Sequence, residues 1–132
     1  MSFLLDTDIC SAYLKNDPLV VNRVMLHFGG LHVSTITVGE LMTWAFRAKA
    51  PPNRLQGVRD FLAASLIHDI DIDVAELFGE LRALFLDQNR AIGEMDLLNA
   101  SVALIHNLTM VTHNTQDYAL IPGLVLMDWL KP

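Results

Sequence analysis

Short apolar runs alternate along the chain with longer stretches that have helical periodicity. Strands are predicted at residues 3–5, 31–35, 66–73, 108–112 and 124–127. Helices are predicted at residues 8–15, 18–28, 35–48, 53–65, 74–89 and 96–107. Thr35 or Thr37 is the expected cap of the third helix, and residues 113–123 are expected to form a loop. In residues 66–73 isoleucines alternate with acids, which predicts an edge or half-exposed strand.

Strands that alternate with helices favour an α/β fold with a mainly parallel sheet covered on both faces. In such folds the functional crevice lies at the carboxyl ends of the strands. We therefore expect Asp6 and Asp8, residues 35–40 and residues 112–117 to meet at that edge.

The length of 132 residues matches a single domain over residues 1–132. A hydrophobic fraction of 52% and a mean hydropathy of +0.36 exceed what one small core needs, so a partner or a second copy is expected to cover apolar surface. No apolar run approaches the ~20 residues that span a bilayer, and the first residues do not resemble a signal peptide. We expect a soluble, cytoplasmic protein without membrane contact.

The net charge of −6 argues against a broad surface that coats nucleic acid. Four of the nine basic residues nevertheless lie between Arg47 and Arg59, which keeps a local phosphate contact open. The single cysteine, Cys10, excludes an internal disulfide and a multi-cysteine zinc site, and it is expected to be a small core residue.

Four acidic residues from separate segments are candidate metal ligands. Asp6 follows the first strand, and Glu40 shares a helix face with Ile36 and Trp44. Asp96 lies in the first turn of a helix, and Asp117 follows the fourth strand. Taken singly, Glu40 also fits an exposed helix position, and Asp96 also fits a favourable contact with the helix dipole. Taken together, oxygen ligands without a cysteine or histidine set suit magnesium or manganese.

The loop after the fourth strand contains further polar side chains. Thr112, Asn114 and Asp117 also fit an ordinary capped turn. His113 has no partner visible in the sequence, and we assign it no chemistry.

Three stretches carry a resemblance over the whole chain: LLDTDICS, STITVGEL, and IGEMDLLNASVALIHNLTMVTHNTQDYALIPGLVLMDW. At these residues the chain resembles the PIN-domain ribonucleases, and within them the VapC toxins of bacterial toxin–antitoxin pairs. The resemblance implies a PIN-like three-layer α/β/α sandwich with a mainly parallel sheet of four to five strands. It also implies endonucleolytic cleavage of RNA with magnesium or manganese held by a quartet of acids.

Mapped onto the matching positions, the first three acids of that quartet are Asp6, Glu40 and Asp96. The fourth position, often Asp in the wider family, is Asn114 here, so Asp117 is expected to supply the charge and the number of metal ions stays open. The catalytic set is then Asp6, Glu40, Asp96 and Asp117. Asp8 stands where the family often has Asn, and we expect it to serve helix entry and to orient the turn.

The resemblance further suggests how RNA would be held. A cation on Asp6 and Asp96, with Glu40 and Asp117 nearby, would position a water for in-line attack on a phosphodiester, and Glu40 or a metal-bound hydroxide would take the proton. Side chains expected to hold phosphate or water, or to guide the RNA backbone, are Thr7, Thr112, Asn114, Arg47, Lys49, Arg54 and Arg90. VapC-like proteins usually dimerise and bind a small antitoxin, for which residues 8–28, Trp44 and Phe46 are candidate contacts.

Two other classes explain parts of the pattern. Haloacid-dehalogenase-like phosphatases also begin with an apolar strand followed by Asp-x-Asp. These enzymes need a lysine after a later strand, and none of Lys15, Lys49 and Lys131 follows a predicted strand in that place. A response-receiver domain would need an aspartate after the middle strand and a lysine after the last, and neither is evident. A degenerate PIN domain that only binds a partner is a further alternative.

Overall fold

Five strands form one parallel sheet at the centre of the molecule. The structure is a computed structural model, which describes residues 2–132. The strands are β1 (Phe3–Leu5), β2 (Leu31–Ser34), β3 (Leu66–His68), β4 (Thr109–Val111) and β5 (Leu126–Met127). Their order across the sheet is β3-β2-β1-β4-β5, and every neighbouring pair is parallel. The predicted parallel sheet is confirmed.

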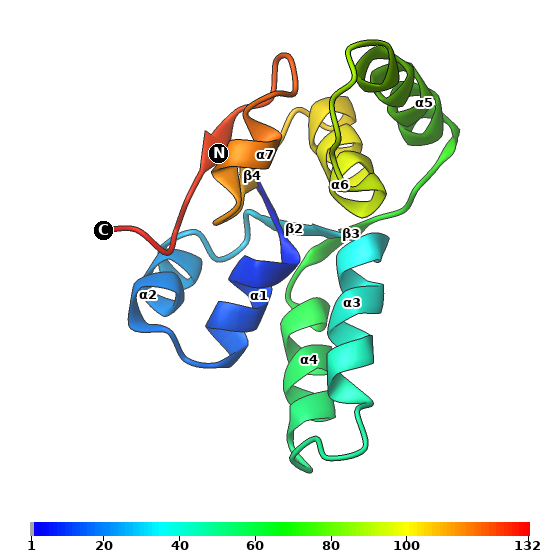
Figure 1. Cartoon of the computed structure of the whole chain (residues 1–132). Helices are drawn as coiled ribbons and strands as arrows, with labels where there is room; N and C mark the ends of the chain where they lie inside the picture. The colour runs from blue at the N-terminus through cyan, green and yellow to red at the C-terminus, as the bar shows by residue number, and fades with distance from the viewer. Residues whose placement is uncertain (1) are drawn as a thin grey trace.

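Helices cover both faces of this sheet (Figure 1). One face packs against α1 (Thr7–Leu14), α2 (Pro18–Leu26), α3 (Thr35–Ala45) and α4 (Arg54–Ala63). The other packs against α5 (Ile72–Asp87), α6 (Glu94–Ile105) and α7 (Thr115–Tyr118).

Side-chain alternation in β1 explains the two layers. Phe3 and Leu5 point into the core beneath α1–α4, whereas Leu4 points into the core beneath α5–α7. Val111 and Met110 of β4 divide in the same way between the two cores. A central strand with both faces buried must be apolar throughout, as FLL is. The expected three-layer α/β/α sandwich is confirmed.

Helix entries are set by short polar side chains that accept hydrogen bonds from free backbone N–H groups. Asp6 caps α1, Ser34 caps α3 through Thr37 N at 3.3 Å, and Asp71 caps α5 through Val74 N at 3.0 Å. The expected cap at Thr35 or Thr37 is wrong, because Ser34 is the last residue with extended backbone and Thr35 is already helical. Asp6, and not Asp8, is the N-cap of α1.

The predicted strand 66–73 is wrong beyond His68. β3 lies at the sheet edge as expected, but α5 already begins at Ile72 because Asp71 provides its cap. Ile72 is exposed, so the isoleucine alternation that suggested a longer strand does not reflect burial in the sheet. The short helix α7 falls within residues predicted to be a loop.

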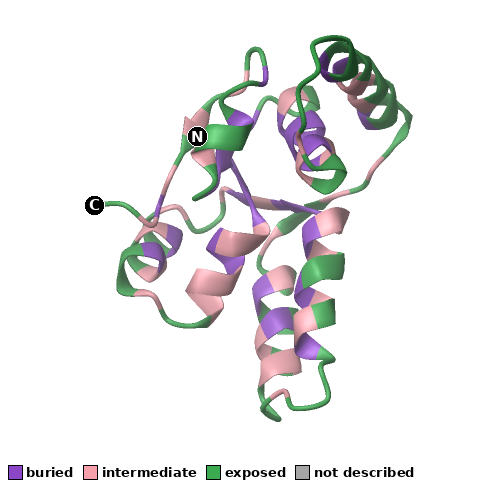
Figure 2. Cartoon of the chain, viewed as in Figure 1, coloured by how far each residue is buried: buried purple, intermediate pink, exposed green. Residues whose placement is uncertain are grey.

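The pair α3 and α4 extends away from the sheet as a helical hairpin (Figure 1). Leu41 and Ala45 of α3 pack in one core with Val58 and Phe61 of α4. The connection between the two helices is mostly exposed (Figure 2).

The burial of the remaining apolar residues follows two patterns. Cys10 is fully buried in the core, as expected. Part of the apolar excess lies on the surface, where Met25, Leu26 and Phe28 are exposed near the end of α2. Within residues 2–132, none of the helices has the length and apolar character needed to cross a bilayer.

Candidate active site

Asp6 is the centre of the polar cluster at the carboxyl end of β1. Its side chain is only 8% exposed and accepts four hydrogen bonds. The donors are Thr7 N at 2.9 Å, Asn99 Nδ2 at 3.1 Å, Thr112 Oγ1 at 2.9 Å and Tyr118 OH at 3.2 Å. Burial raises the pKa of Asp6 above its ordinary value, although these donors oppose the shift. The carboxylate is thus fixed in place by groups from α1, from α6, from the residue that follows β4 and from α7.

Asn99 of α6 connects Asp6 to Thr37 of α3 and Ser34 of β2, and its role was not identified from the sequence. It is 1% exposed, and its Nδ2 lies 3.1 Å from Asp6 and 3.4 Å from Thr37 Oγ1. Its Oδ1 accepts a hydrogen bond from the Ser34 hydroxyl. The available signal was a polar residue beside Ala100 in the buried stripe of α6, because a buried amide needs partners.

Glu40 is connected to Asp6 through Thr7. The Thr7 hydroxyl donates to Glu40 Oε1 at 2.6 Å and lies 3.2 Å from Thr37 Oγ1, while Thr7 N donates to Asp6. Glu40 itself is exposed on α3. Both carboxylates therefore face the start of α1, one buried and one open to solvent.

Asp96 approaches the same cluster from the first turn of α6. It is half-buried, and its pKa is raised by that burial and by the negative charge of Asp6. The Tyr118 hydroxyl, which donates to Asp6, also interacts with Asp96. Burial and these acids raise the pKa of Tyr118, so its hydroxyl stays protonated. Repulsion between the acids is the electrostatic condition that a bound cation relieves.

The loop after β4 provides the exposed rim of the site. Asn114 Nδ2 donates to Asp117 Oδ2 at 2.9 Å, and Asn114 N donates to Thr112 Oγ1 at 3.1 Å. Asp117 lies close enough to Asp96 for its charge to raise the pKa of Asp96. The structure thus brings Asp117 toward the other acids, with the Asn114 amide held against it.

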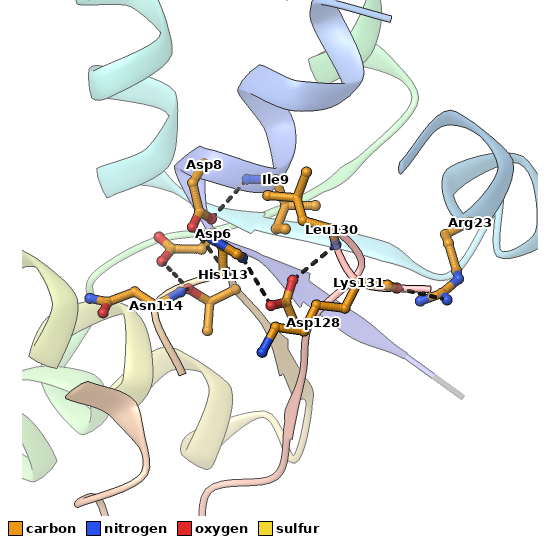
Figure 3. Close-up of polar contacts among 10 residues, drawn as sticks. Asp6, Asp8, Ile9, Arg23, His113, Asn114, Asp128, Leu130 and Lys131 are labelled. Carbon is orange, nitrogen blue, oxygen red and sulfur yellow. Dashed lines mark hydrogen bonds and ion pairs between the residues drawn. The ribbon is translucent and has the colours of Figure 1, made fainter. Parts of the chain in front are cut away.

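Asp8 and His113 extend the cluster on its other side (Figure 3). Asp8 accepts hydrogen bonds from Ile9 N at 2.8 Å and His113 N at 3.0 Å, so it holds the loop after β4. Burial and the Asp6 charge raise the pKa of Asp8 to about 6. His113 Nδ1 lies 2.9 Å from Asp128 Oδ2, a partner 15 residues away that the sequence did not reveal.

The predicted basic residues are divided between two places. Arg47 and Lys49 are exposed in the connection between α3 and α4, and Arg54 begins α4. These three lie on the hairpin, away from the strand ends (Figure 1). Arg90 is exposed in the connection that leads into α6.

The ligand types of this site suit a hard divalent cation, because every candidate donor is an oxygen. Burial is the main cause of the raised pKa values of Asp6, Asp8 and Asp96, and the negative charge of Asp6 adds to the rise for Asp8 and Asp96. Across residues 2–132, however, no three His, Cys, Asp or Glu side chains already converge in an arrangement that could hold a metal ion. Because the Tyr118 hydroxyl interacts with both carboxylates, it would have to move before Asp96 could come closer to Asp6.

The parallel α/β fold, with acids at the carboxyl ends of its strands, is accompanied by a match of the sequence to a known family. The family described as PIN domain matches residues 3–122. The chain belongs to the PIN-domain family, and its curated relatives are VapC ribonucleases.

Two relatives illustrate the similarity. The tRNA(fMet)-specific endonuclease VapC of Shigella flexneri is 32% identical over 130 residues, covering 98% of each chain. Ribonuclease VapC2 of Haemophilus influenzae is 30% identical and covers 98% of this chain and 99% of its own.

Solved structures agree with the sequence comparison. The chain matches a structure of DNA-bound VapBC from Salmonella typhimurium with a TM-score of 0.91, 31% identity and 98% coverage of both chains. It matches VapBC2 from Rickettsia felis, bound to a promoter DNA fragment, with a TM-score of 0.89, 30% identity and coverage of 98% and 99%.

Proposed function

We propose that this protein is the toxin of a toxin–antitoxin pair, an endoribonuclease that depends on magnesium or manganese and cleaves a structured RNA in the cytoplasm. One PIN-like domain over residues 1–132 would carry the activity. The observation that supports this most directly is that Asp6, Asp96 and Asp117 lie at one edge of the sheet of a PIN fold, where burial and the charges of Asp6 and Asp117 raise the pKa of Asp96. The whole-length similarity to VapC ribonucleases supports the choice of RNA as substrate.

The carboxylates of Asp6, Asp96, Glu40 and Asp117 would hold the cation, with Asn114 as a further oxygen donor. When bound, such an ion stabilises charge that develops on phosphoryl oxygens and lowers the pKa of water. Glu40 is exposed, as Asp117 is, so it can reach the attacking water and accept its proton. The Thr7 hydroxyl orients Glu40 for that role.

Other residues of the site would position the RNA. Thr112 is fully buried and donates to Asp6, so it would act through that carboxylate and not through phosphate directly. Arg90 and the hairpin residues Arg47, Lys49 and Arg54 would guide the backbone electrostatically.

We propose a homodimer bound by a small cognate antitoxin. The neighbouring solved structures are VapBC complexes, which supports a partner of that kind. Exposed apolar residues on α2, among them Met25, Leu26 and Phe28, support an interface for a partner or a second copy.

The decisive test is RNA cleavage by an Asp96→Asn variant. Asp6 is a poor first choice because its carboxylate accepts four hydrogen bonds. The side-chain NH₂ group of an asparagine at this position would face some of these donors and leave them without an acceptor. Asp96 is half-buried, so its replacement should leave the fold intact. We expect manganese-dependent cleavage to fall by about 10²–10⁴-fold.

Asp73→Asn is the matched control, because Asp73 lies in the first turn of α5 as Asp96 lies in the first turn of α6. The control should cut RNA at the wild-type rate. Wild-type cleavage by Asp96→Asn would refute the assignment. A wild-type protein that binds antitoxin but cuts no RNA with either metal would instead indicate a degenerate PIN domain.

A further inference from the structure

The outer part of the α3–α4 hairpin, residues 41–59, has a charge opposite to that of the rest of the chain. Residues 41–59 contain four basic residues and no acidic residue, a net charge of +4. Since the whole chain carries −6, the remaining residues together carry −10. A basic segment on an acidic protein is a local binding surface for anions.

Three side chains organise this surface into a pocket. The Arg54 guanidinium lies over the Trp44 ring, with Cζ 4.3 Å from the ring centroid, and Arg54 Nη1 donates to the Trp44 carbonyl at 3.2 Å. Lys15 Nζ, at the end of α1, lies 5.9 Å from the same ring. With Asn53 these residues line a surface cavity of about 290 Å³. The guanidinium is held in place before any ligand arrives, which reduces the entropic cost of binding.

The pocket lies along the path of two helices that begin at the acidic site. The α1 helix starts at Thr7, directly after Asp6, and Lys15 follows its last residue. On α3, Glu40 and Trp44 are four residues apart, so they share a face and are separated by about 6 Å along the axis. The α1 and α3 helices contact each other, so their faces form a continuous route from the acids to the pocket.

The combination selects one class of ligand. A guanidinium stacked on an indole offers a planar surface to a nucleobase, and the Lys15 ammonium offers a charge to its phosphate. An acidic peptide would use the charges but would leave the stacking surface unused. We propose that the pocket of Trp44, Arg54 and Lys15 is a subsite for an unpaired nucleotide that flanks the cleaved bond in a single-stranded segment of the structured RNA. This inference rests on the proposed ribonuclease function, because it names where that substrate is anchored.

The fluorescence anisotropy of a short, labelled single-stranded RNA measures binding. A metal chelator in the buffer prevents cleavage during the measurement. Trp44 is half-buried whereas Trp129 is fully buried, so bound RNA should also quench the fluorescence of Trp44. Arg54→Gln should weaken binding roughly tenfold and reduce the slope of log affinity against log salt by about 0.7. Trp44→Leu should weaken binding to a similar extent and abolish the quenching.

Arg59→Gln is the matched control, since Arg59 is exposed on the same helix and contributes the same charge. It should leave the quenching at the wild-type level and weaken binding much less than Arg54→Gln, because Arg59 belongs to the basic segment but does not line the pocket. Arg54→Lys should retain the salt slope while losing affinity, because lysine keeps the charge and lacks the planar stack. That conservative variant also covers the case in which Arg54→Gln does not fold.

Several results would overturn the subsite. They are wild-type affinity of Arg54→Gln and Arg54→Lys, equal weakening by Arg59→Gln, or equal quenching by inorganic phosphate alone. A further one is that the Arg54 variants lose affinity for an acidic peptide but not for RNA. Failure of the ribonuclease proposal would look different, because RNA would bind with the expected variant pattern while no metal supported cleavage.

Discussion

The side-chain amide of Asn99 donates to the Asp6 carboxylate at 3.1 Å, across 93 positions of sequence. This contact fixes α6 against the end of β1, and its other amide atom accepts a hydrogen bond from Ser34. One buried residue therefore connects the helix that carries Asp96 to the Asp6 carboxylate at the end of β1.

Replacing Asn99 by Ala should reduce both stability and activity. The change leaves the Ser34 hydroxyl without its buried acceptor and Asp6 without one donor, which should cost about 1–3 kcal/mol in the free energy of unfolding. Urea denaturation would measure that loss, and RNA cleavage should fall with it. Asn22→Ala, at an exposed position of α2, is the control and should change neither quantity. Equal stability of Asn99→Ala and wild type would contradict the role of this amide.

Glu40 offers a test that separates chemistry from folding. Glu40→Gln keeps an oxygen that can accept from the Thr7 hydroxyl, which now lies 2.6 Å from Glu40 Oε1. Because Glu40 is exposed, we expect the melting temperature to stay at the wild-type value while cleavage falls by about 10²-fold or more. Thr7→Val should preserve the negative charge of Glu40 but remove the hydrogen bond that orients it, so this variant should lose less cleavage activity than Glu40→Gln. Unchanged cleavage by Glu40→Gln would remove Glu40 from the catalytic set.

Metal binding should be visible as stabilisation. Manganese at about 100 times its dissociation constant should stabilise the native state by about 2.7 kcal/mol, provided that the unfolded chain does not bind it. A thermal shift with and without chelator would measure this effect. Asp96→Asn should lose most of the shift, whereas Asp73→Asn should retain it. Equal shifts for both variants would mean that manganese binds elsewhere.

The sheet was accessible from the sequence because its central strands are apolar on both faces. FLL in β1 and the apolar run that becomes β4 could pack only in a covered parallel sheet, and the strand-end rule then brought residues 6, 35–40 and 112–117 together. The observed hydrogen bonds, from Thr112 to Asp6 and from Thr7 to Glu40, agree with that expectation.

The errors have a common physical origin. Ser34 and Asp71 determine where α3 and α5 begin, because each accepts a hydrogen bond from a backbone N–H of its helix. From the sequence alone, either residue could equally belong to the preceding strand. The partners of Asn99 and His113 come from distant segments, so periodicity could not reveal them. The ligand roles of Asp6, Glu40, Asp96 and Asp117 stay predictions for the variants above.

A group of three histidines at the sheet edge should make stability depend on pH. His32 Nδ1 of β2 lies 2.7 Å from His68 Nε2 of β3, and the His106 ring, at the end of α6, lies 4.1 Å from that of His68. Burial, and then the charge of His106, lowers the pKa of His32 and of His68 below the ordinary 6.5, against a weaker opposite effect of Asp69 on His68.

Because the folded state holds these two imidazoles neutral, the unfolded state binds more protons just below pH 6.5. Their contribution to stability is therefore complete above that pH and is lost as the pH falls. The raised pKa values of Asp6, Asp8 and Asp96 act in the opposite direction, so wild type must be compared with a variant that shares those acids.

His68→Gln is that variant. At ~pH 7.5 it should be less stable than wild type by about 1 kcal/mol, because the hydrogen bond to His32 is weakened. Toward ~pH 5.5 this difference in the free energy of unfolding should shrink. Wild type is destabilised there because folding keeps His68 neutral, and the variant has no imidazole at this position. His106→Gln should reduce the pH dependence as well, because it removes the charge that lowers both pKa values. Urea denaturation at both pH values measures the effect, and a stability difference that stays constant between them would show that the histidine pair does not titrate with folding.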